Sequence, residues 1–196
     1  MAVSYTEQEI IKGCRDGNRA VQEVLYRDYY SPFMKVCVRY TKNLEDAEQV
    51  LNDGFLKIFT KIASFDGAGS FAGWMRRVMV NTCLDFLRSH ELKTGMQMHI
   101  NTDKIEDSLL ASTTANSGLE KIEFKELVSL IQGLPAMTRT VFNLFVFEGM
   151  THKQIAGALP ISEGTSQWHV HQARHLLQKK IKKVNAQNEF YASHRI

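Results

Sequence analysis

Apolar side chains recur every three or four residues along most of the chain, which is the period of an amphipathic α-helix. In the first half, this spacing predicts helices at about residues 7–15, 19–40, 44–62 and 71–88. Three of them follow a polar residue that can accept hydrogen bonds from the first helical turn, namely Thr6, Asn43 and Ser70, and Glu9 completes a capping box with Thr6. Pro32 is expected to kink or divide the second helix.

A change of composition separates this half from the next. Residues 92–118 are rich in polar and small side chains and lack a long apolar period, which favours a flexible linker with one helical turn near Leu109 and Leu110. Further helices are predicted at about residues 119–132, 135–148, 151–159 and 162–184, and no strand pattern of comparable quality occurs. We therefore expect an all-α fold class. Its parts are two small helical domains (1–91 and 119–184), the linker 92–118 and a frayed tail, 185–196.

The composition limits the class of protein. A chain of 196 residues, 44% of them hydrophobic, can form one domain or two small ones. Its apolar stretches are too short to cross a bilayer, and its first residues lack the pattern of a secretory signal. The three cysteines, Cys14, Cys37 and Cys83, follow no disulfide or zinc spacing. We expect a cytoplasmic protein without membrane insertion.

The net charge of +3 is too small to indicate nucleic-acid binding by itself. However, the positive excess lies near the C-terminal end, where four lysines gather: Lys179, Lys180, Lys182 and Lys183. These lysines are suited to phosphate contacts. The alternative, which the charge alone favours, is a solvated helix end whose lysines complement the helix dipole.

The helices predicted at 151–159 and 162–184 are joined by about three residues, which is typical of a helix-turn-helix. Spacings of four, three and four place a buried face on the second helix at Ser166, Val170, Ala173 and Leu177. The other side is expected to present Gln167, Trp168, His171, Gln172 and His175 to base edges in a major groove, with Arg174 on phosphate. A helical hairpin that only packs on a neighbour remains an alternative. A metal site at His171 and His175 lacks further ligands.

A second stripe lies on the helix that follows Ser70. Trp74, Arg77, Asn81 and Arg88 cluster within about 60° around the helix axis. The indole is suited to stacking on an unpaired base while arginines, Arg76 among them, hold the backbone. The glycine-rich loop before the helix could admit an extruded base. The alternative, that Trp74 belongs to the core, stays open.

The helix predicted at 44–62 has an acidic outer side, which contains Glu45, Asp46, Glu48 and Asp53. Such a side is either solvated, as most are, or a docking surface for a basic protein. The sequence contains no phosphate loop, no nucleophile with its base and no paired-carboxylate site. We therefore expect neither enzymatic activity nor a cofactor.

Two blocks of residues resemble the extracytoplasmic-function (ECF) sigma factors. The first block resembles region 2 of that family, and its motifs are Leu44 to Val50, Phe55 to Phe59, Ser70-Phe71-x-x-Trp74 and Asn81-x-x-x-Asp85-x-x-Arg88. The second resembles region 4, and its motifs are Leu134-Pro135-x-x-x-Arg139-x-Val141-Phe142, Thr151-x-x-x-Ile155-Ala156, Ser162 to Thr165 and Ala173-Arg174. The similarity covers about residues 12–91 and 119–183, with both blocks in the expected order.

The resemblance implies a promoter-specificity subunit of bacterial RNA polymerase, which binds promoter DNA and assists melting of its −10 element. Docking on the β′ clamp helices of the polymerase core is implied for Asp46, Glu48, Gln49, Asn52 and Asp53. Contact with the melted −10 strand is implied for Phe65, Ser70, Phe71, Trp74, Arg76, Arg77, Asn81, Asp85 and Arg88. Contact with the −35 groove is implied for Thr151, Lys153, Thr165, Gln167, Trp168, His169, His171, Gln172, Arg174 and His175. Further implied partners are the polymerase β flap and an anti-sigma factor.

Some positions depart from the family pattern. Gln167 and Gln172 stand where basic residues are common, Trp168 and His169 are unusual, and Gln49 replaces a frequent aspartate. Two other functions remain alternatives. A regulator that acts without polymerase predicts tight binding to duplex DNA by itself. A helical adaptor that binds only proteins predicts that Gln167, Trp168 and Gln172 are dispensable.

Overall fold

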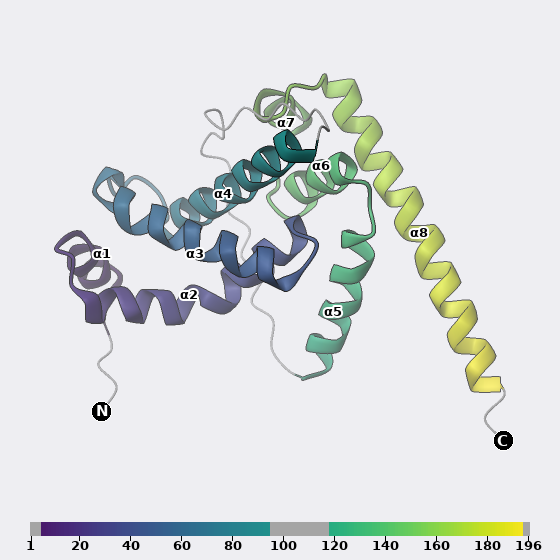
Figure 1. Cartoon of the computed structure of the whole chain (residues 1–196), viewed down its shortest axis with the longest axis horizontal. Helices are drawn as coiled ribbons and strands as arrows, with labels where there is room; N and C mark the ends of the chain where they lie inside the picture. The colour runs from purple at the N-terminus through teal and green to yellow at the C-terminus, as the bar shows by residue number, and fades with distance from the viewer. Residues whose placement is uncertain (1–4, 95–117, 194–196) are drawn as a thin grey trace. The chain divides into compact units, whose positions relative to one another are not determined.

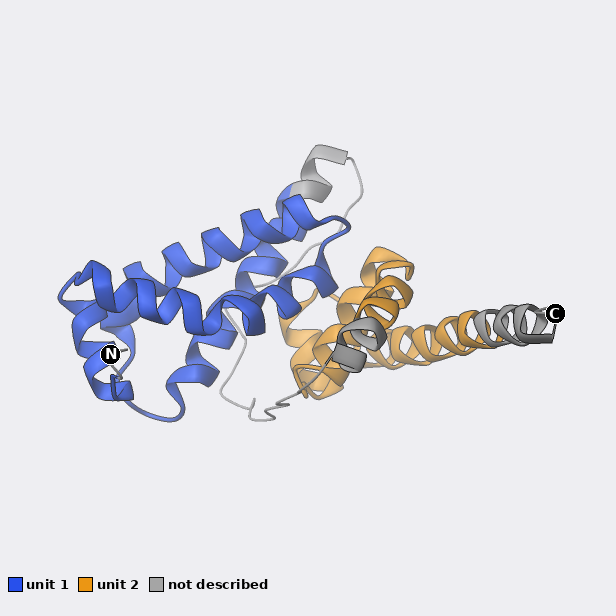
Figure 2. Ribbon diagram, turned by 90° about the horizontal axis from the view of Figure 1, so that it is seen from below, with its two compact units in different colours: residues 1–105 blue, residues 106–196 orange. Residues whose placement is uncertain are grey.

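The computed structural model describes residues 5–94 and 118–193, and all regular elements in these ranges are helices (Figure 1). The all-α fold class predicted from the periodicity is confirmed. The chain divides into two compact units, Met1–Ile105 and Glu106–Ile196, which Figure 2 shows in blue and orange. Most of the expected linker, including the turn near Leu109 and Leu110, lies outside the described residues.

The first unit is a helical bundle whose elements are α1 (Glu7–Arg15), α2 (Arg19–Tyr40), α3 (Leu44–Lys61), the short 3₁₀ helix η1 (Ile62–Ser64) and α4 (Phe71–Thr94). The three predicted caps are confirmed: Thr6 forms a capping box with Glu9, the Asn43 side chain accepts a hydrogen bond from the Asp46 backbone N–H, and Ser70 Oγ accepts one from the Gly73 N–H. In the bundle α2, α3 and α4 pack on one another, and α1 contacts α2 and η1 (Figure 1).

α2 has the predicted limits and is not divided at Pro32, because Leu25 before the proline and Phe33 and Val36 after it are all buried in the bundle core and hold both halves in one helix. One expected helix end in this unit is wrong. α4 continues past Arg88 to Thr94, since neither glycine nor proline interrupts the segment between them. The linker therefore does not begin at residue 92.

The core of the first unit comes from one face of each long helix. α3 buries the apolar stripe predicted from its sequence, including Val50, Leu51 and Phe55, and α4 buries Met75 and Met79. The cysteines Cys14, Cys37 and Cys83 are buried, and none of the three forms a disulfide. This packing fixes which side of α3 and of α4 is left for other contacts.

The second unit consists of α5 (Gly118–Gln132), α6 (Ala136–Val146), α7 (His152–Ala158) and α8 (Glu163–Ser193). Its core contains Ile131 and Leu134 near the end of α5, Phe142 of α6 and Ala173 of α8. The frayed tail expected from residue 185 is wrong as far as Ser193, because no glycine or proline follows Gly164 and the helix is not stopped.

None of the helices in the described part of the chain is both long and apolar enough to cross a membrane.

Candidate nucleic-acid interface

One stripe along α4 combines an indole, an amide and charged groups. Trp74, Arg77, Asn81, Asp85 and Arg88 recur at steps of three and four residues, and all five are half-buried. Half-buried side chains lose less conformational freedom on binding a ligand than fully exposed ones. The stripe predicted from spacing is thus present as a partly ordered surface, on the helix that follows the glycine-rich loop.

Trp74 belongs to an aromatic cluster. Its ring stacks on Phe71, with centroids 5.9 Å apart and planes at 12°, and lies 5.7 Å from Phe65. Phe65 and Phe71 are only 5% and 1% exposed in this structure, and the DNA contacts that the resemblance implies for them stay predictions. Their rings fill the space beneath the loop and hold one side of the half-buried indole.

The loop from Phe65 to Ser70 has a defined backbone. Gly67 and Gly69 have φ of 83° and 85°, a left-handed conformation that side chains rarely adopt. Asp66 Oδ1 accepts a hydrogen bond of 2.9 Å from the Ala68 backbone N–H, which is an Asx turn. Ser70 Oγ, named above as a DNA contact, accepts a hydrogen bond from α4 and serves as its cap.

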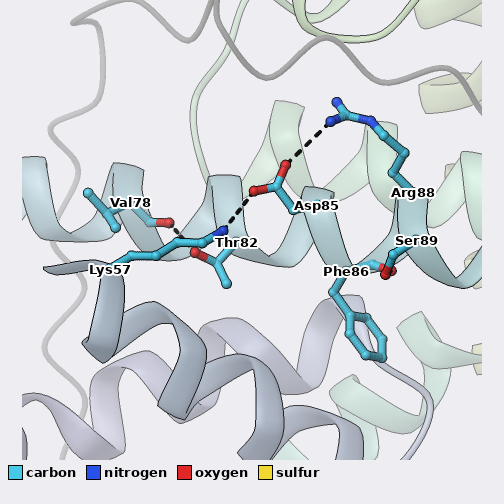
Figure 3. Close-up of polar contacts among 7 residues, drawn as sticks. All are labelled: Lys57, Val78, Thr82, Asp85, Phe86, Arg88 and Ser89. Atoms are coloured by element: carbon cyan, nitrogen blue, oxygen red, sulfur yellow. Dashed lines mark hydrogen bonds and ion pairs between the residues drawn. The ribbon is translucent and has the colours of Figure 1, made fainter. Parts of the chain in front are cut away.

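An ion-pair network lies toward the C-terminal end of the α4 stripe (Figure 3). Lys57 Nζ of α3 lies 2.8 Å from Asp85 Oδ2, and Arg88 Nη1 lies 3.4 Å from Asp85 Oδ1. Both carboxylate oxygens are therefore engaged, and a carboxylate repels phosphate. In this structure Asp85 holds two cations side by side, and the DNA contact implied for it stays a prediction.

Lys57 is a residue that sequence reasoning missed. It lies 28 positions before Asp85, and only the packing of α3 on α4 brings the two together. Its side chain is 36% exposed, and that of Arg88 is 31% exposed. The network carries two positive charges and one negative, so this end of the stripe has a net positive charge suited to a phosphate.

The outer face of α3 is acidic and also contains an exposed leucine. Glu48, Gln49, Asn52 and Asp53 are exposed, and Leu56 on the same face is 63% exposed. Asp46 is half-buried, because its side chain and backbone both bond Asn43 at the helix start. An exposed large apolar side chain among acidic groups is typical of a protein contact surface. The periodicity of the sequence does not indicate Leu56, because this residue lies outside the apolar stripe that α3 buries.

The second unit contains the helix-turn-helix predicted from spacing. Ser166, Val170 and Ala173 are buried and Leu177 is half-buried, so the predicted inner face of α8 is confirmed. Both caps are confirmed as well, since Thr151 forms a capping box with Gln154 and Ser162 Oγ accepts a hydrogen bond from the Thr165 N–H at 3.0 Å. The residue types expected on the outer side are arranged as follows: Gln167, Trp168, His171, Arg174 and His175 are exposed, and Gln172 is half-buried.

Contacts between side chains fix α7 and α6 against α8. His152 Nδ1 lies 2.9 Å from Ser166 Oγ, and its ring stacks on Phe145 with centroids 4.6 Å apart. These contacts set the angle between the two helices of the motif. Thr151 and Lys153, at the start of α7, are exposed, and Thr165 in the first turn of α8 is half-buried.

His169 does not lie with the other outward side chains of α8. Its Nδ1 lies 3.0 Å from Thr138 Oγ1 of α6, and burial lowers the pKa of its imidazole, which favours the neutral ring. In this structure the His169 ring is half-buried against α6, and the DNA contact implied for it stays a prediction. Position 169 comes three residues after buried Ser166 and one before buried Val170, so it flanks the inner face.

Comparison with known families identifies both units. The Sigma-70 region 2 model matches residues 25–92, which include α3 and the α4 stripe. The Sigma-70, region 4 model matches residues 124–177, which include the helix-turn-helix, and the two matches together cover more than half of the chain. Curated relatives are ECF sigma factors. The chain belongs to the ECF sigma factors.

Two curated relatives illustrate the similarity of this ECF sigma factor to known proteins. The RNA polymerase sigma-H factor of Pseudomonas aeruginosa is 23% identical over 192 residues, which covers 92% of this chain and 96% of the relative. The ECF RNA polymerase sigma-E factor of Haemophilus influenzae is 24% identical over 198 residues, with coverage of 92% and 98%. The similarity therefore extends over both units rather than over the helix-turn-helix alone.

The fold of this ECF sigma factor also resembles that of a solved one. The sigma factor RpoE of Bartonella quintana, in a complex with the anti-sigma factor NepR, is 16% identical and superposes with a TM-score of 0.50. The match covers 82% of this chain and 98% of that chain. At this identity the likeness shows the fold alone.

The family membership establishes the general function. This ECF sigma factor directs RNA polymerase to specific promoters for the initiation of transcription. A regulator that acts without polymerase, the alternative kept open by the sequence, is not favoured, because region 2 is present as well as the helix-turn-helix. Sigma factors are generally not enzymes.

Proposed function

We propose that the two units divide promoter recognition between them, and that α3 binds the polymerase core. In this division the α4 stripe holds the melted −10 strand, while α8 reads the −35 element in the major groove. The observation that carries the proposal is the α4 stripe itself. An indole, an arginine, an amide and a paired cation lie in one half-buried row beside a loop with two left-handed glycines. Stacking platforms flanked by cations bind single strands without requiring a duplex.

The α3 face supplies the surface for the polymerase core. Its exposed Glu48 and Asp53 fit a basic partner, and exposed Leu56 adds apolar area to the same contact. The β′ clamp helices are the partner that we propose for this face. For the second unit we propose the β flap as its polymerase contact. Each unit then has one contact with DNA and one with the enzyme.

Weak binding to free DNA follows from the charge. A chain of net charge +3 neutralises few phosphates, and the affinity of proteins for duplex DNA comes largely from such contacts. When the polymerase holds both units at once, each unit raises the effective concentration of the other at the promoter. We therefore expect the isolated protein to bind promoter duplex at least about a hundredfold more weakly than the holoenzyme.

Run-off transcription with purified core polymerase tests the proposal. We expect transcripts from one defined start site only when the protein is added. The double variant Glu48→Lys, Asp53→Lys is expected to lose this activity, because it reverses the charge of the α3 face. Asp28→Lys, which introduces a lysine at an exposed position of α2, is the matched control and is expected to stay active.

Two results would contradict this proposal. Equal transcription with and without the protein would exclude a role in initiation. Tight, specific duplex binding by the isolated protein in a gel-shift experiment would favour a regulator that needs no polymerase. If the double variant is active, the proposed polymerase contact of α3 is wrong, whereas the proposed promoter contacts are not affected.

We further propose an anti-sigma factor as a partner. The support is that the solved relative from Bartonella quintana was captured with such a protein, NepR, on a similar fold. A partner of this kind would compete with the polymerase core for the sigma factor. Purification of the tagged protein from its own cells is expected to yield a stoichiometric partner whose addition suppresses run-off transcription. A co-purified protein that leaves transcription unchanged would contradict this role.

A further inference from the structure

α1 (Glu7–Arg15) lies before the residues that match the region 2 model, which begins at residue 25, yet it contacts η1, which immediately precedes the Phe65–Ser70 loop. We propose that Arg15, the last residue of α1, is a positioning residue for the Phe65–Ser70 loop and, through it, for Trp74. The inference rests on the proposed function of the α4 stripe, and it assigns part of that function to a helix that the family match does not include.

The guanidinium of Arg15 joins α1 to the end of η1. Nε donates a hydrogen bond of 3.4 Å to the Ile62 carbonyl oxygen, and Nη2 donates a second hydrogen bond to the Phe65 carbonyl oxygen. The Ile62 carbonyl, at the end of α3, also accepts a hydrogen bond from the Phe65 backbone N–H, and carbonyl groups at a helix end carry partial negative charge. A guanidinium can bond two carbonyl groups at once, because its donors form a planar fork.

Phe65 transmits this contact to the DNA-binding surface. Arg15 holds the Phe65 carbonyl, while the Phe65 ring lies 5.3 Å from Phe71 and 5.7 Å from Trp74. A shift of the Phe65 backbone therefore moves the surface on which the indole packs. Arg15 and Trp74 are connected through this single residue, although 59 positions separate them in the sequence.

Packing leaves an open space where α1 meets the loop. This open pocket of about 230 Å³ is lined by Gln8, Ile11, Lys12 and Arg15 of α1 and by Phe65, Asp66 and Gly67 of the loop. Where apolar groups do not fill an interface, hydrogen bonds determine its geometry. The loop itself contains two glycines at positive φ. Its first residue, Phe65, is buried and donates its backbone N–H to the Ile62 carbonyl oxygen, and the Arg15 hydrogen bond adds a restraint on the Phe65 carbonyl.

Arg15 is itself exposed, so direct contact with a DNA phosphate is the competing explanation. The two explanations differ in their salt dependence. A side chain that neutralises a phosphate releases counterions, and its removal reduces the slope of log K against log salt by about 0.7 for a single strand. A positioning residue lowers the affinity but leaves this slope unchanged.

The experiment measures binding of holoenzyme to a labelled single-stranded oligonucleotide that carries the nontemplate −10 segment of a promoter mapped by run-off transcription. Arg15→Ala is expected to bind about three- to tenfold more weakly, as the loss of two charged hydrogen bonds predicts, with an unchanged salt slope. Arg15→Lys, which keeps the charge but not the fork, is expected to be intermediate. Lys12→Ala removes the same charge one turn earlier in the same cavity and is expected to bind like the wild type.

Each outcome decides between the explanations. A reduced slope for Arg15→Ala, or an equal loss for Lys12→Ala, would overturn positioning in favour of direct electrostatics. Wild-type affinity in Arg15→Ala, in an assay where Trp74→Ala is defective, would overturn the inference and leave the proposed function standing. Wild-type affinity in Trp74→Ala would instead contradict the proposed function. Melting temperature and binding to a duplex −35 fragment serve as fold controls, and if Arg15→Ala fails them, Arg15→Gln replaces it.

Discussion

Replacing Trp74 by alanine is expected to lower promoter opening by the holoenzyme about ten- to a hundredfold, because stacking of one base on an aromatic ring contributes about 1–3 kcal/mol. The half-buried indole has one side on Phe71 and leaves the rest of its ring for an unpaired base. Permanganate reactivity of unpaired thymines measures opening. A Trp74→Phe variant keeps a smaller ring and is expected to retain part of the activity.

The same tryptophan also contributes to folding, so the measurement needs a control for stability. Phe71→Leu removes buried aromatic packing beneath Trp74 without removing the indole, and both variants are expected to lower the melting temperature. If equal losses of stability give equal losses of opening, Trp74 acts through packing and not through DNA. If Trp74→Ala binds normally to a template melted beforehand, Trp74 acts in separating the strands. If the defect persists on that template, Trp74 acts in holding the separated strand.

Much of the fold could be predicted from spacing and from caps. Thr6, Asn43, Thr151 and Ser162 all cap the helices that their positions indicate, because capping depends on neighbours three residues away. Helix interruptions and ends were harder to predict. Pro32 fails to divide α2 because tertiary packing holds both halves of the helix, which local sequence cannot show.

For the candidate site, too, features within one helix could be predicted and contacts between elements could not. The α4 stripe and the outer face of α8 could be predicted, because each lies on one helix of known period. Contacts between elements could not. Lys57 reaches Asp85, Arg15 reaches Phe65 and His169 reaches Thr138 only through packing of helices distant in the sequence. These contacts also give Asp85 and His169 internal partners that their positions in the sequence do not reveal.

A common feature connects the two proposed DNA-binding surfaces. In each, the residues proposed to contact DNA are supported by side chains that are themselves buried or paired. Phe71 supports Trp74, and buried Ser166 holds α7 against α8 through His152. Arg139, a region 4 motif residue, is 2% exposed and donates to the Gln132 carbonyl, so its role in this structure is internal. Some motif residues therefore hold the geometry of these surfaces from within.

The −35 preference is expected to depend on the two glutamines of α8. One bidentate side-chain contact with a base pair contributes about 1–3 kcal/mol of discrimination between bases. Gln167→Ala is therefore expected to lose about tenfold in affinity for the preferred base at one position of the −35 element, with little change at the other positions. Gln172→Ala is expected to act at a different position, since the two residues lie about 140° apart around the helix. Binding of holoenzyme to promoters with a randomised −35 element measures both changes.

Arg174→Ala is the matched control on the same exposed side of α8. As a phosphate contact, Arg174 should affect all sequences nearly equally, and its loss should reduce the slope of log K against log salt by about 1. The glutamine variants should keep the slope and change the sequence profile. If all three variants leave both the profile and the affinity unchanged, α8 does not read DNA. The second unit would then act on protein alone, and promoter selection would rest with α4.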